Sequence, residues 1–336
     1  MSEGKREVEL MNNLSRKARL YISLGIISVI ILVSFSVIFY GVYQVYYDPA
    51  SLFRHDFSGS GEVEEYFDER LVNVVVLGLH NRQEDNTFGE VYFVDTILIA
   101  SVNFDRDTLT LLAVPRDTSV EIAHSGVEDR IRQSYSYGFE QGSGDPHQEG
   151  MRYTLDTISD FLDGLKLDYH IAMDIEGLKQ LIDSLGGVYY TVEEQMTGPT
   201  PAESLDAGPQ MLDGRGYVTY LTYRDEDARD DLNRMERQQD LLFATFEYFQ
   251  EMGMFRYVVP TYSAYREHVR TDLNLNQVAA LTLFASERLE ADAIKSYSLQ
   301  GEYSPADSAE EETYYLSIDE KEKNEMIDKL TGGQGN

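Results

Sequence analysis

The sequence of 336 residues contains no cysteine and no tryptophan, and its 59 Asp and Glu residues far outnumber its 28 Lys and Arg residues. The absence of cysteine excludes disulfide bonds, thiolate metal ligands and cysteine nucleophiles. The formal net charge of −31 argues against nucleic acid as a partner, because sequence-independent binding of nucleic acid requires many Lys and Arg contacts to phosphates. Any anionic ligand must therefore be held by a local group of cations.

One long segment has no charged side chain. It covers residues 20–47, 28 residues in all, and is longer than a helix needs to cross the hydrocarbon core of a membrane. A cleaved signal peptide is the alternative, but the apolar part of a signal peptide is shorter and a small-residue cleavage site follows it. The five basic and three acidic residues of segment 1–19 predict a cytoplasmic N-terminus. We therefore predict a single-pass protein of the cell membrane with an extracytoplasmic C-terminal domain.

Composition divides the part that follows the predicted transmembrane helix. Residues 48–70 are polar, which predicts a tether. We expect residues 71–300 to form the folded domain and residues 301–336 to form an acidic C-terminal segment. We expect the chain to fray after Pro305. Without segment 1–19, 23 basic and 56 acidic residues remain, so the acidity belongs to the predicted extracytoplasmic part.

Predicted strands and helices alternate along the domain. Runs of apolar, often β-branched residues predict strands over 72–79, 96–103, 108–114, 169–173, 188–192 and 293–299, the second and third forming a hairpin. Helical spacing of apolar residues predicts helices over 146–162, 174–185, 214–223, 231–252 and 275–289. Residues 193–209 are loop-like. This alternation is typical of an α/β sandwich.

Several of the rare cations lie at positions of interest for function. Arg82 and Arg116 each follow a predicted strand, and Arg224 ends a predicted helix. Arg234 and Arg237 lie on one face of the next predicted helix. Ligands of α/β folds bind at strand ends, and each guanidinium can donate two hydrogen bonds to phosphate oxygens. A cleft lined by such arginines would suit a pyrophosphate, with Asp95 and Asp231 as a metal ligand and a base. The alternative is a set of surface ion pairs, such as Arg116 with Asp117.

The order of the motifs resembles that of the LytR-CpsA-Psr family of bacterial envelope phosphotransferases. The resemblance covers residues 71–250 and extends more loosely to 300. The segments that carry it are VNVVVLGLHNR (72–82), VDTILIASVNFDRDTLTLLAVPRDTSVEI (94–122), DRIRQSYSYGF (129–139), LDYHIAMDIEGLKQLIDSLGGVYYTV (167–192), MLDGRGYVTYLTYRDED (211–227) and DLNRMERQQ (231–239).

The resemblance implies a three-layer α/β/α sandwich with a mixed central sheet and a hydrophobic tunnel for a polyprenyl diphosphate lipid. It implies transfer of a glycopolymer from that lipid to peptidoglycan or another envelope acceptor, with Mg²⁺ as cofactor. By position, the family's pyrophosphate-binding arginines match Arg82, Arg116, Arg224 and Arg234. Its metal-binding Asp matches Asp95, and the acid of its last motif matches Asp231. The catalytic residues implied are Arg116 and Asp231.

This chain departs from the family's pattern at three other positions. His80 stands where the family usually has Asp, Phe93 where it has Arg, and Thr222 where it has the first Arg of an Arg-x-Arg pair. His80 removes one hard oxygen ligand for Mg²⁺. Arg132 stands where the family commonly has a small polar residue, and it would restore one positive charge if its side chain pointed into the site.

Two functions from different classes follow. The first is a membrane-anchored, metal-assisted phosphotransferase that uses a polyprenyl diphosphate donor. The second is a polyprenyl-phosphate-binding envelope sensor or assembly factor whose catalysis is weakened by the changes at His80, Phe93 and Thr222. A transcriptional attenuator, the function in the family's older name, is disfavoured, because the domain is acidic, is predicted outside the membrane and lacks a DNA-reading motif.

Overall fold

The structure is a computed structural model that describes residues 43–53, 71–82, 91–198, 200, 203–223, 230–253, 255–305 and 314–332, without the side chains of 82, 91, 230–236, 239, 255 and 256. The chain divides into two compact units, 1–54 and 55–336. In the first unit, residues 43–47 are helical and the 3-10 helix η1 (Pro49–Phe53) follows. None of the described helices is both long and apolar enough to cross a membrane. The predicted transmembrane helix lies, except for residues 43–47, outside the described residues.

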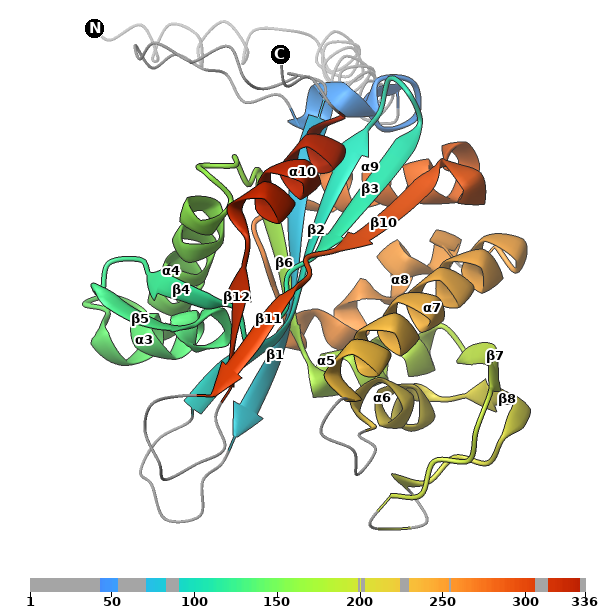
Figure 1. Cartoon of the computed structure of the whole chain (residues 1–336). Coiled ribbons are helices and arrows are strands. Elements are labelled where there is room, and N and C mark those ends of the chain that lie inside the picture. Colours follow the sequence, from blue (N-terminus) through green and yellow to red (C-terminus); the bar gives the residue numbers. More distant parts are fainter. Residues whose placement is uncertain are drawn as a thin grey trace, which may run out of the picture. The chain divides into compact units, whose positions relative to one another are not determined.

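The second unit is built on a six-stranded sheet of order β10-β3-β2-β1-β6-β9 (Figure 1). The strands are β1 (Leu71–Arg82), β2 (Val91–Asn103), β3 (Thr108–Ala113), β6 (Tyr169–Asp174), β9 (Val269–Thr271) and β10 (Ile294–Ser298). β2 is antiparallel to both β1 and β3, β6 is parallel to β1, β10 is parallel to β3, and β9 is antiparallel to β6. The carboxyl ends of β1, β3, β6 and β10 therefore lie at one edge of the sheet, where β2 begins.

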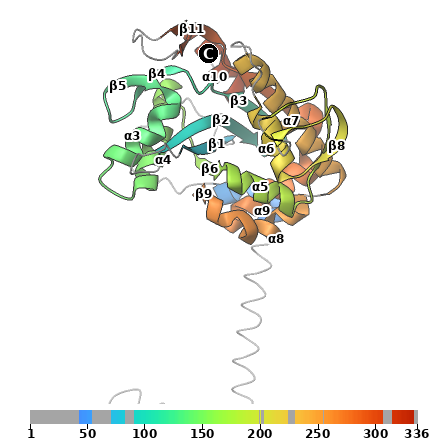
Figure 2. The ribbon, with the colours of Figure 1, turned by 90° about the horizontal axis from the view of Figure 1, so that it is seen from below.

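Helices cover both faces of this sheet (Figures 1 and 2). One face packs against α3 (Ser134–Gln141), α4 (Pro146–Phe161) and α10 (Glu320–Thr331), which share one apolar core with the strands. The opposite layer holds α5 (Ile175–Ser184), α6 (Gly214–Thr222), α7 (Asp230–Glu251), α8 (Phe255–Tyr265) and α9 (Leu275–Leu283), with a second core among α5, α6 and α7. The mixed α/β fold with a mixed central sheet is thus confirmed.

Three small hairpins complete the unit. They pair β4 (Ser119–Ile122) with β5 (Val127–Arg130), β7 (Val188–Val192) with β8 (Gly208–Leu212), and β11 (Gly301–Pro305) with β12 (Tyr314–Ile318). Short 3-10 or π turns lie at η2 (Ile131–Gln133), η4 (Arg266–His268), η5 (Phe284–Arg288) and η6 (Ala291–Ala293). The β8 strand corrects the sequence-based prediction of a loop at 208–209, because β8 pairs in full with β7.

The two faces of the sheet differ in how completely they are buried. On the face toward α3 and α4, Val75 and Leu77 are 0 % and 1 % exposed. Of the residues that alternate with them and point to the other face, Val76, Leu98 and Ala113 are only half-buried, whereas Val74 and Leu111 are 3 % and 6 % exposed. A sheet packed tightly on both faces would bury both sets. The second face therefore keeps part of its apolar surface uncovered.

The expectation that the chain frays after Pro305 was wrong for residues 314–332. Met326 and Leu330, one helical turn apart on α10, are 7 % and 1 % exposed and belong to the core beneath α3 and α4. Lys323 of the same helix lies 2.9 Å from a carboxylate oxygen of both Asp163 and Glu320. The acidic residues that suggested fraying lie largely on the outer side of a helix whose apolar stripe is short.

Candidate active site

The strand ends bring three predicted site residues to one edge of the sheet. Arg82 is the last residue of β1, Arg116 follows the end of β3 by three residues, and Asp95 lies in the first half of the antiparallel strand β2. This is the edge at which the carboxyl ends of the parallel strands meet, the usual place for ligands in α/β folds. The side chain of Arg82 lies outside the described part of the structure.

The remaining predicted residues belong to the layer of α6 and α7. Asp231 and Arg234 lie in the first turns of α7, but their side chains are outside the described residues, and Arg224 is outside them altogether. Side chains of α7 hold the end of α6 in place. Arg237 Nη2 donates to the Tyr223 carbonyl at 2.9 Å, and Gln238 Nε2 donates to the Leu221 carbonyl at 2.9 Å. These contacts satisfy carbonyls that have no partner within their own helix.

A β-bulge sets the direction of Asp95. Gly78 pairs with Thr96 and Leu79 pairs with Val94, so Asp95 has no partner on β1. Val94 is 0 % exposed and Ile97 is 2 % exposed, and the bulge turns the residues between them away from that core. A Cβ on Gly78 would lie only 3.0 Å from the Thr96 Cβ, so a glycine suits the close approach of the strands here.

Two arginines contact the same oxygen of Asp95. Arg132 Nη2 lies 2.7 Å from Asp95 Oδ1, and Arg116 Nη1 lies 3.4 Å from that atom. The side chains of Arg116 and Asp117 are 9 % and 12 % exposed, so their pair is largely buried, which corrects the alternative of a surface ion pair between them. The guanidinium carbon of Arg132 lies 5.0 Å from the ring centre of Phe93, within range of a cation–π interaction. Arg132 therefore points toward the predicted site.

The β4–β5 hairpin brings Arg132 beside Arg116. The chain turns back after β4, the Ile131 N–H donates to the Thr118 carbonyl at 2.8 Å, and the Arg132 N–H donates to the Arg116 carbonyl at 3.1 Å. The same pairing places Arg130 Nη1 3.7 Å from Asp117 Oδ1. Arg130 and Asp117 were not among the predicted site residues. The sequence did offer one signal for Arg130. Cations are rare in this chain, and Arg130 and Arg132 are only two residues apart.

The group Asp95, Arg116, Asp117, Arg130 and Arg132, called the arginine group below, carries one net positive charge. Arg116 Nε lies 3.5 Å from Asp117 Oδ2, which completes a continuous set of ion pairs. Burial lowers the pKa of Arg132; Asp95 opposes this and the neighbouring Arg116 adds to it, and the net direction is downward. The excess of guanidinium over carboxylate in a partly buried place suits an anion with several oxygens.

The residues at the three departures offer no replacement charge of their own. His80 is the cross-strand partner of Phe93 on β1, and Phe93 serves as the surface beneath the Arg132 guanidinium. Thr222 donates its hydroxyl to the Val218 carbonyl of its own helix at 2.8 Å. Beside Phe93 the positive charge is supplied by Arg132, whose orientation could not be predicted from the sequence.

The described residues do not by themselves fit a magnesium ion. Among them, no three His, Asp or Glu side chains gather where they could hold a metal, and Asp95 Oδ1 faces two guanidiniums. Mg²⁺ in proteins needs an octahedron of oxygen ligands. Asp231, whose side chain is not described, leaves the magnesium prediction untested.

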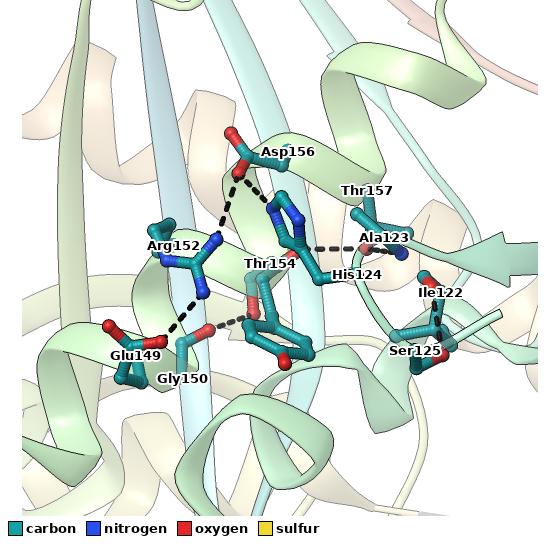
Figure 3. A network of polar contacts seen from close by, with 11 residues as sticks. Ile122, Ala123, His124, Ser125, Glu149, Gly150, Arg152, Thr154, Asp156 and Thr157 are labelled. Carbon is teal, nitrogen blue, oxygen red and sulfur yellow. Dashed lines mark hydrogen bonds and ion pairs between the residues drawn. The ribbon is translucent and has the colours of Figure 1, made fainter. Parts of the chain in front are cut away.

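A second polar network joins α4 to the turn between β4 and β5 (Figure 3). His124 Nε2 lies 2.6 Å from Asp156 Oδ2, and Arg152 lies between Asp156 and Glu149, at 3.9 Å and 2.7 Å. The side chains of His124, Arg152 and Asp156 are each more than 40 % exposed. Exposed pairs of this kind contribute little to stability, and the network contains no metal-ligand set.

Comparison with known proteins agrees with the motifs. The model of the LytR_cpsA_psr family matches residues 52–332. This chain belongs to that family. A TagU from Halalkalibacterium halodurans, a polyisoprenyl-teichoic acid–peptidoglycan teichoic acid transferase, is 28 % identical over 251 residues, which are 74 % of this chain and 75 % of the relative.

Solved structures share the fold of this family member. The crystal structure of Bacillus subtilis TagV has a TM-score of 0.64 and 20 % sequence identity, and the match covers 80 % of this chain and 98 % of TagV. The structure of TagT bound to LIIa-WTA has a TM-score of 0.58 and 20 % identity, and the match covers 82 % of this chain and 95 % of TagT. At such identities the likeness concerns the fold alone.

Proposed function

We propose that this protein is a phosphotransferase that moves a glycopolymer from a polyprenyl diphosphate carrier to peptidoglycan or another envelope acceptor. The observation that carries the proposal is the arginine group, with its net positive charge, at the ligand-binding edge of the sheet in a LytR_cpsA_psr chain. The proposal includes anchoring in the cell membrane by residues 20–47, with the domain on the extracytoplasmic side.

The chemistry of transfer assigns a role to each charged residue. Arg116 donates hydrogen bonds to the diphosphate and stabilises the charge that develops on the leaving phosphate. Arg82, Arg224 and Arg234 add donors to the same diphosphate. Asp231 accepts the proton of the attacking sugar hydroxyl as a general base. The hydroxyl oxygen bonds to the phosphorus that carries the glycopolymer, the bond from that phosphorus to the bridging oxygen breaks, and polyprenyl phosphate leaves. Mg²⁺ stays a predicted cofactor.

The half-buried part of this apolar face of the sheet supports a lipid as the carrier. Val76, Leu98 and Ala113 are half-buried side chains on the face toward α6 and α7, and Ala113 ends the strand that leads to Arg116. An isoprenoid chain lying on this face would gain about 0.8 kcal/mol for each CH₂ group it buries. A soluble sugar nucleotide would gain nothing comparable.

The test is transfer by the full-length protein in detergent micelles. The donor is a short-chain polyprenyl diphosphate disaccharide and the acceptor is peptidoglycan, assayed with Mg²⁺, with Mn²⁺ and with chelator. We expect turnover by the wild type and a loss of about 100-fold or more in Arg116→Ala. Arg152→Ala, which removes an exposed arginine of α4, is the matched control. No turnover by the wild type under any of these conditions would contradict an enzymatic function.

A second function is favoured by the uncharged residues Phe93 and Thr222 and by the engagement of Asp95 with two guanidiniums. In this alternative the protein binds a polyprenyl phosphate lipid and acts as an envelope sensor or assembly factor. Native mass spectrometry of the detergent-extracted protein separates the two. Intact lipid retained without turnover favours the binding function, and absence of any lipid, without turnover, contradicts both.

A further inference from the structure

Arg132 has a fixed place but few partners. Among the described residues its guanidinium contacts the Asp95 carboxylate and the face of the Phe93 ring, and its Nε is buried without a hydrogen-bond acceptor. A guanidinium has five N–H donors, and an aromatic face uses none of them. The side chain is held in position while most of its capacity to donate hydrogen bonds remains unused.

A purely structural ion pair does not explain this arrangement. A structural pair would balance the charges, whereas among the described side chains Arg132 is the third guanidinium beside two carboxylates. Like charges held together in a partly buried place cost free energy that an anion would recover. The arrangement is therefore expected to be completed by a ligand.

The spacing of Arg132 and Arg116 suits two linked phosphates. Because both guanidiniums contact Asp95 Oδ1, their nitrogens can lie no further apart than the sum of those two contact distances. Two phosphates that share a bridging oxygen present separate sets of oxygens over a similar span. A single phosphate offers fewer oxygens for two guanidinium forks.

We propose that Arg132 is a diphosphate-binding residue of this protein, which contacts the carrier's diphosphate together with Arg116 while Phe93 and Asp95 hold its guanidinium in place. This inference rests on the proposed function. It also assigns a function to Phe93, because its ring orients the guanidinium of Arg132, which the β4–β5 hairpin supplies.

The test is equilibrium binding by calorimetry, with full-length protein in detergent and farnesyl diphosphate and farnesyl monophosphate as probes. We expect Arg132→Ala to weaken diphosphate binding about 10- to 100-fold and monophosphate binding much less, so that selectivity falls. Phe93→Leu removes the cation–π contact and should weaken diphosphate binding about 2- to 5-fold. Arg152→Ala should bind both probes as the wild type does.

A second-site variant separates binding from folding. Arg132→Gln keeps a polar side chain beside Asp95, and Phe93→Arg places a guanidinium in the space next to it. Arg132→Gln lowers the logarithm of the diphosphate association constant. We expect the double variant to recover at least half of that decrease. If the wild type binds the diphosphate and neither Arg132 variant weakens binding, or if the double variant recovers nothing, the inference is wrong. If the wild type binds neither probe, the proposed function fails as well.

Discussion

Leu316 donates its backbone N–H to the carbonyl oxygen of Asp117 at 2.8 Å, and Thr118 forms a parallel β-bridge to Leu316. A strand from the acidic C-terminal segment thus holds the loop that carries Arg116. The side chain of Leu316 is 3 % exposed and belongs among the buried apolar residues. The C-terminal hairpin therefore supports the arginine group from the side opposite to the β4–β5 hairpin.

Replacing Leu316 by proline tests this support. Proline has no N–H, so Leu316→Pro removes the bond to the Asp117 carbonyl and should destabilise the protein by about 1–3 kcal/mol. The loop that carries Arg116 should then be less fixed, and farnesyl diphosphate should bind more weakly. Leu316→Val keeps the N–H and serves as the control. Unchanged binding in Leu316→Pro would show that β12 does not position Arg116.

Asp95 is the shared counter-ion of Arg116 and Arg132. We therefore expect its removal to change both the stability of the protein and its response to an anion. Asp95→Asn should lower the free energy of unfolding by about 1–3 kcal/mol, because two guanidiniums lose their charged partner. Inorganic pyrophosphate should then raise the thermal midpoint of the variant more than that of the wild type, since the anion takes the place of the carboxylate. Thermal unfolding with and without pyrophosphate measures both effects. An equal or smaller shift in the variant would contradict the assignment of Asp95 as their counter-ion.

Thr157 on α4 fixes the end of β4. Its hydroxyl oxygen accepts the Ala123 N–H at 3.0 Å, and the side chain is 1 % exposed. Thr157→Val leaves a buried N–H without an acceptor and should cost about 1–3 kcal/mol in chemical unfolding. Thr282→Val is the control, because the Thr282 hydroxyl only donates to the Val278 carbonyl of its own helix. Equal stability losses in the two variants would refute the role given to Thr157.

Asp272 predicts a pH dependence of stability at the β6–β9 edge. Burial acts to raise the pKa of Asp272, but hydrogen bonds from His170 outweigh it, and the net direction is below the ordinary value of 3.8. The His170 N–H donates to Asp272 Oδ1 at 2.9 Å. A carboxylate with a lowered pKa stabilises the fold fully above its ordinary pKa and loses that contribution as the pH falls through the folded value.

The matching experiment compares the wild type with Asp272→Asn in urea unfolding between pH 7 and pH 2.5. The wild type should be the more stable of the two near neutral pH. The difference should shrink as the pH falls below about 4, where the carboxylate begins to be protonated in the unfolded chain. A difference that is constant over the whole range would contradict the lowered pKa.

Local patterns in the sequence predicted most of the regular elements. The predicted strand 72–79 lies within β1, the predicted hairpin of 96–103 and 108–114 corresponds to β2 and β3, and the predicted helix 231–252 corresponds to α7. These elements carry continuous apolar runs or helical spacing that neighbouring residues alone determine. The placement of Arg82 and Arg116 at one edge followed from their positions after strands.

The features that were not predicted depend on contacts between distant segments. The direction of Arg132 is set by backbone bonds from Ile131 and Arg132 to the segment after Pro115, which no local pattern encodes. The bulge at Asp95 requires knowledge of how β2 pairs with β1. The helix α10 was missed because its apolar stripe is narrow and its sequence is rich in acidic residues. Contacts between distant segments thus bring together strands and helices that local sequence patterns predict.

An experimental structure of the full-length protein with a polyprenyl diphosphate bound tests the proposed site most directly. We expect phosphate oxygens within hydrogen-bond distance of both Arg116 and Arg132, and an isoprenoid chain on the sheet face of Val76 and Leu98. A diphosphate bound away from the carboxyl edge of the sheet, or held there without either arginine, would contradict this proposal.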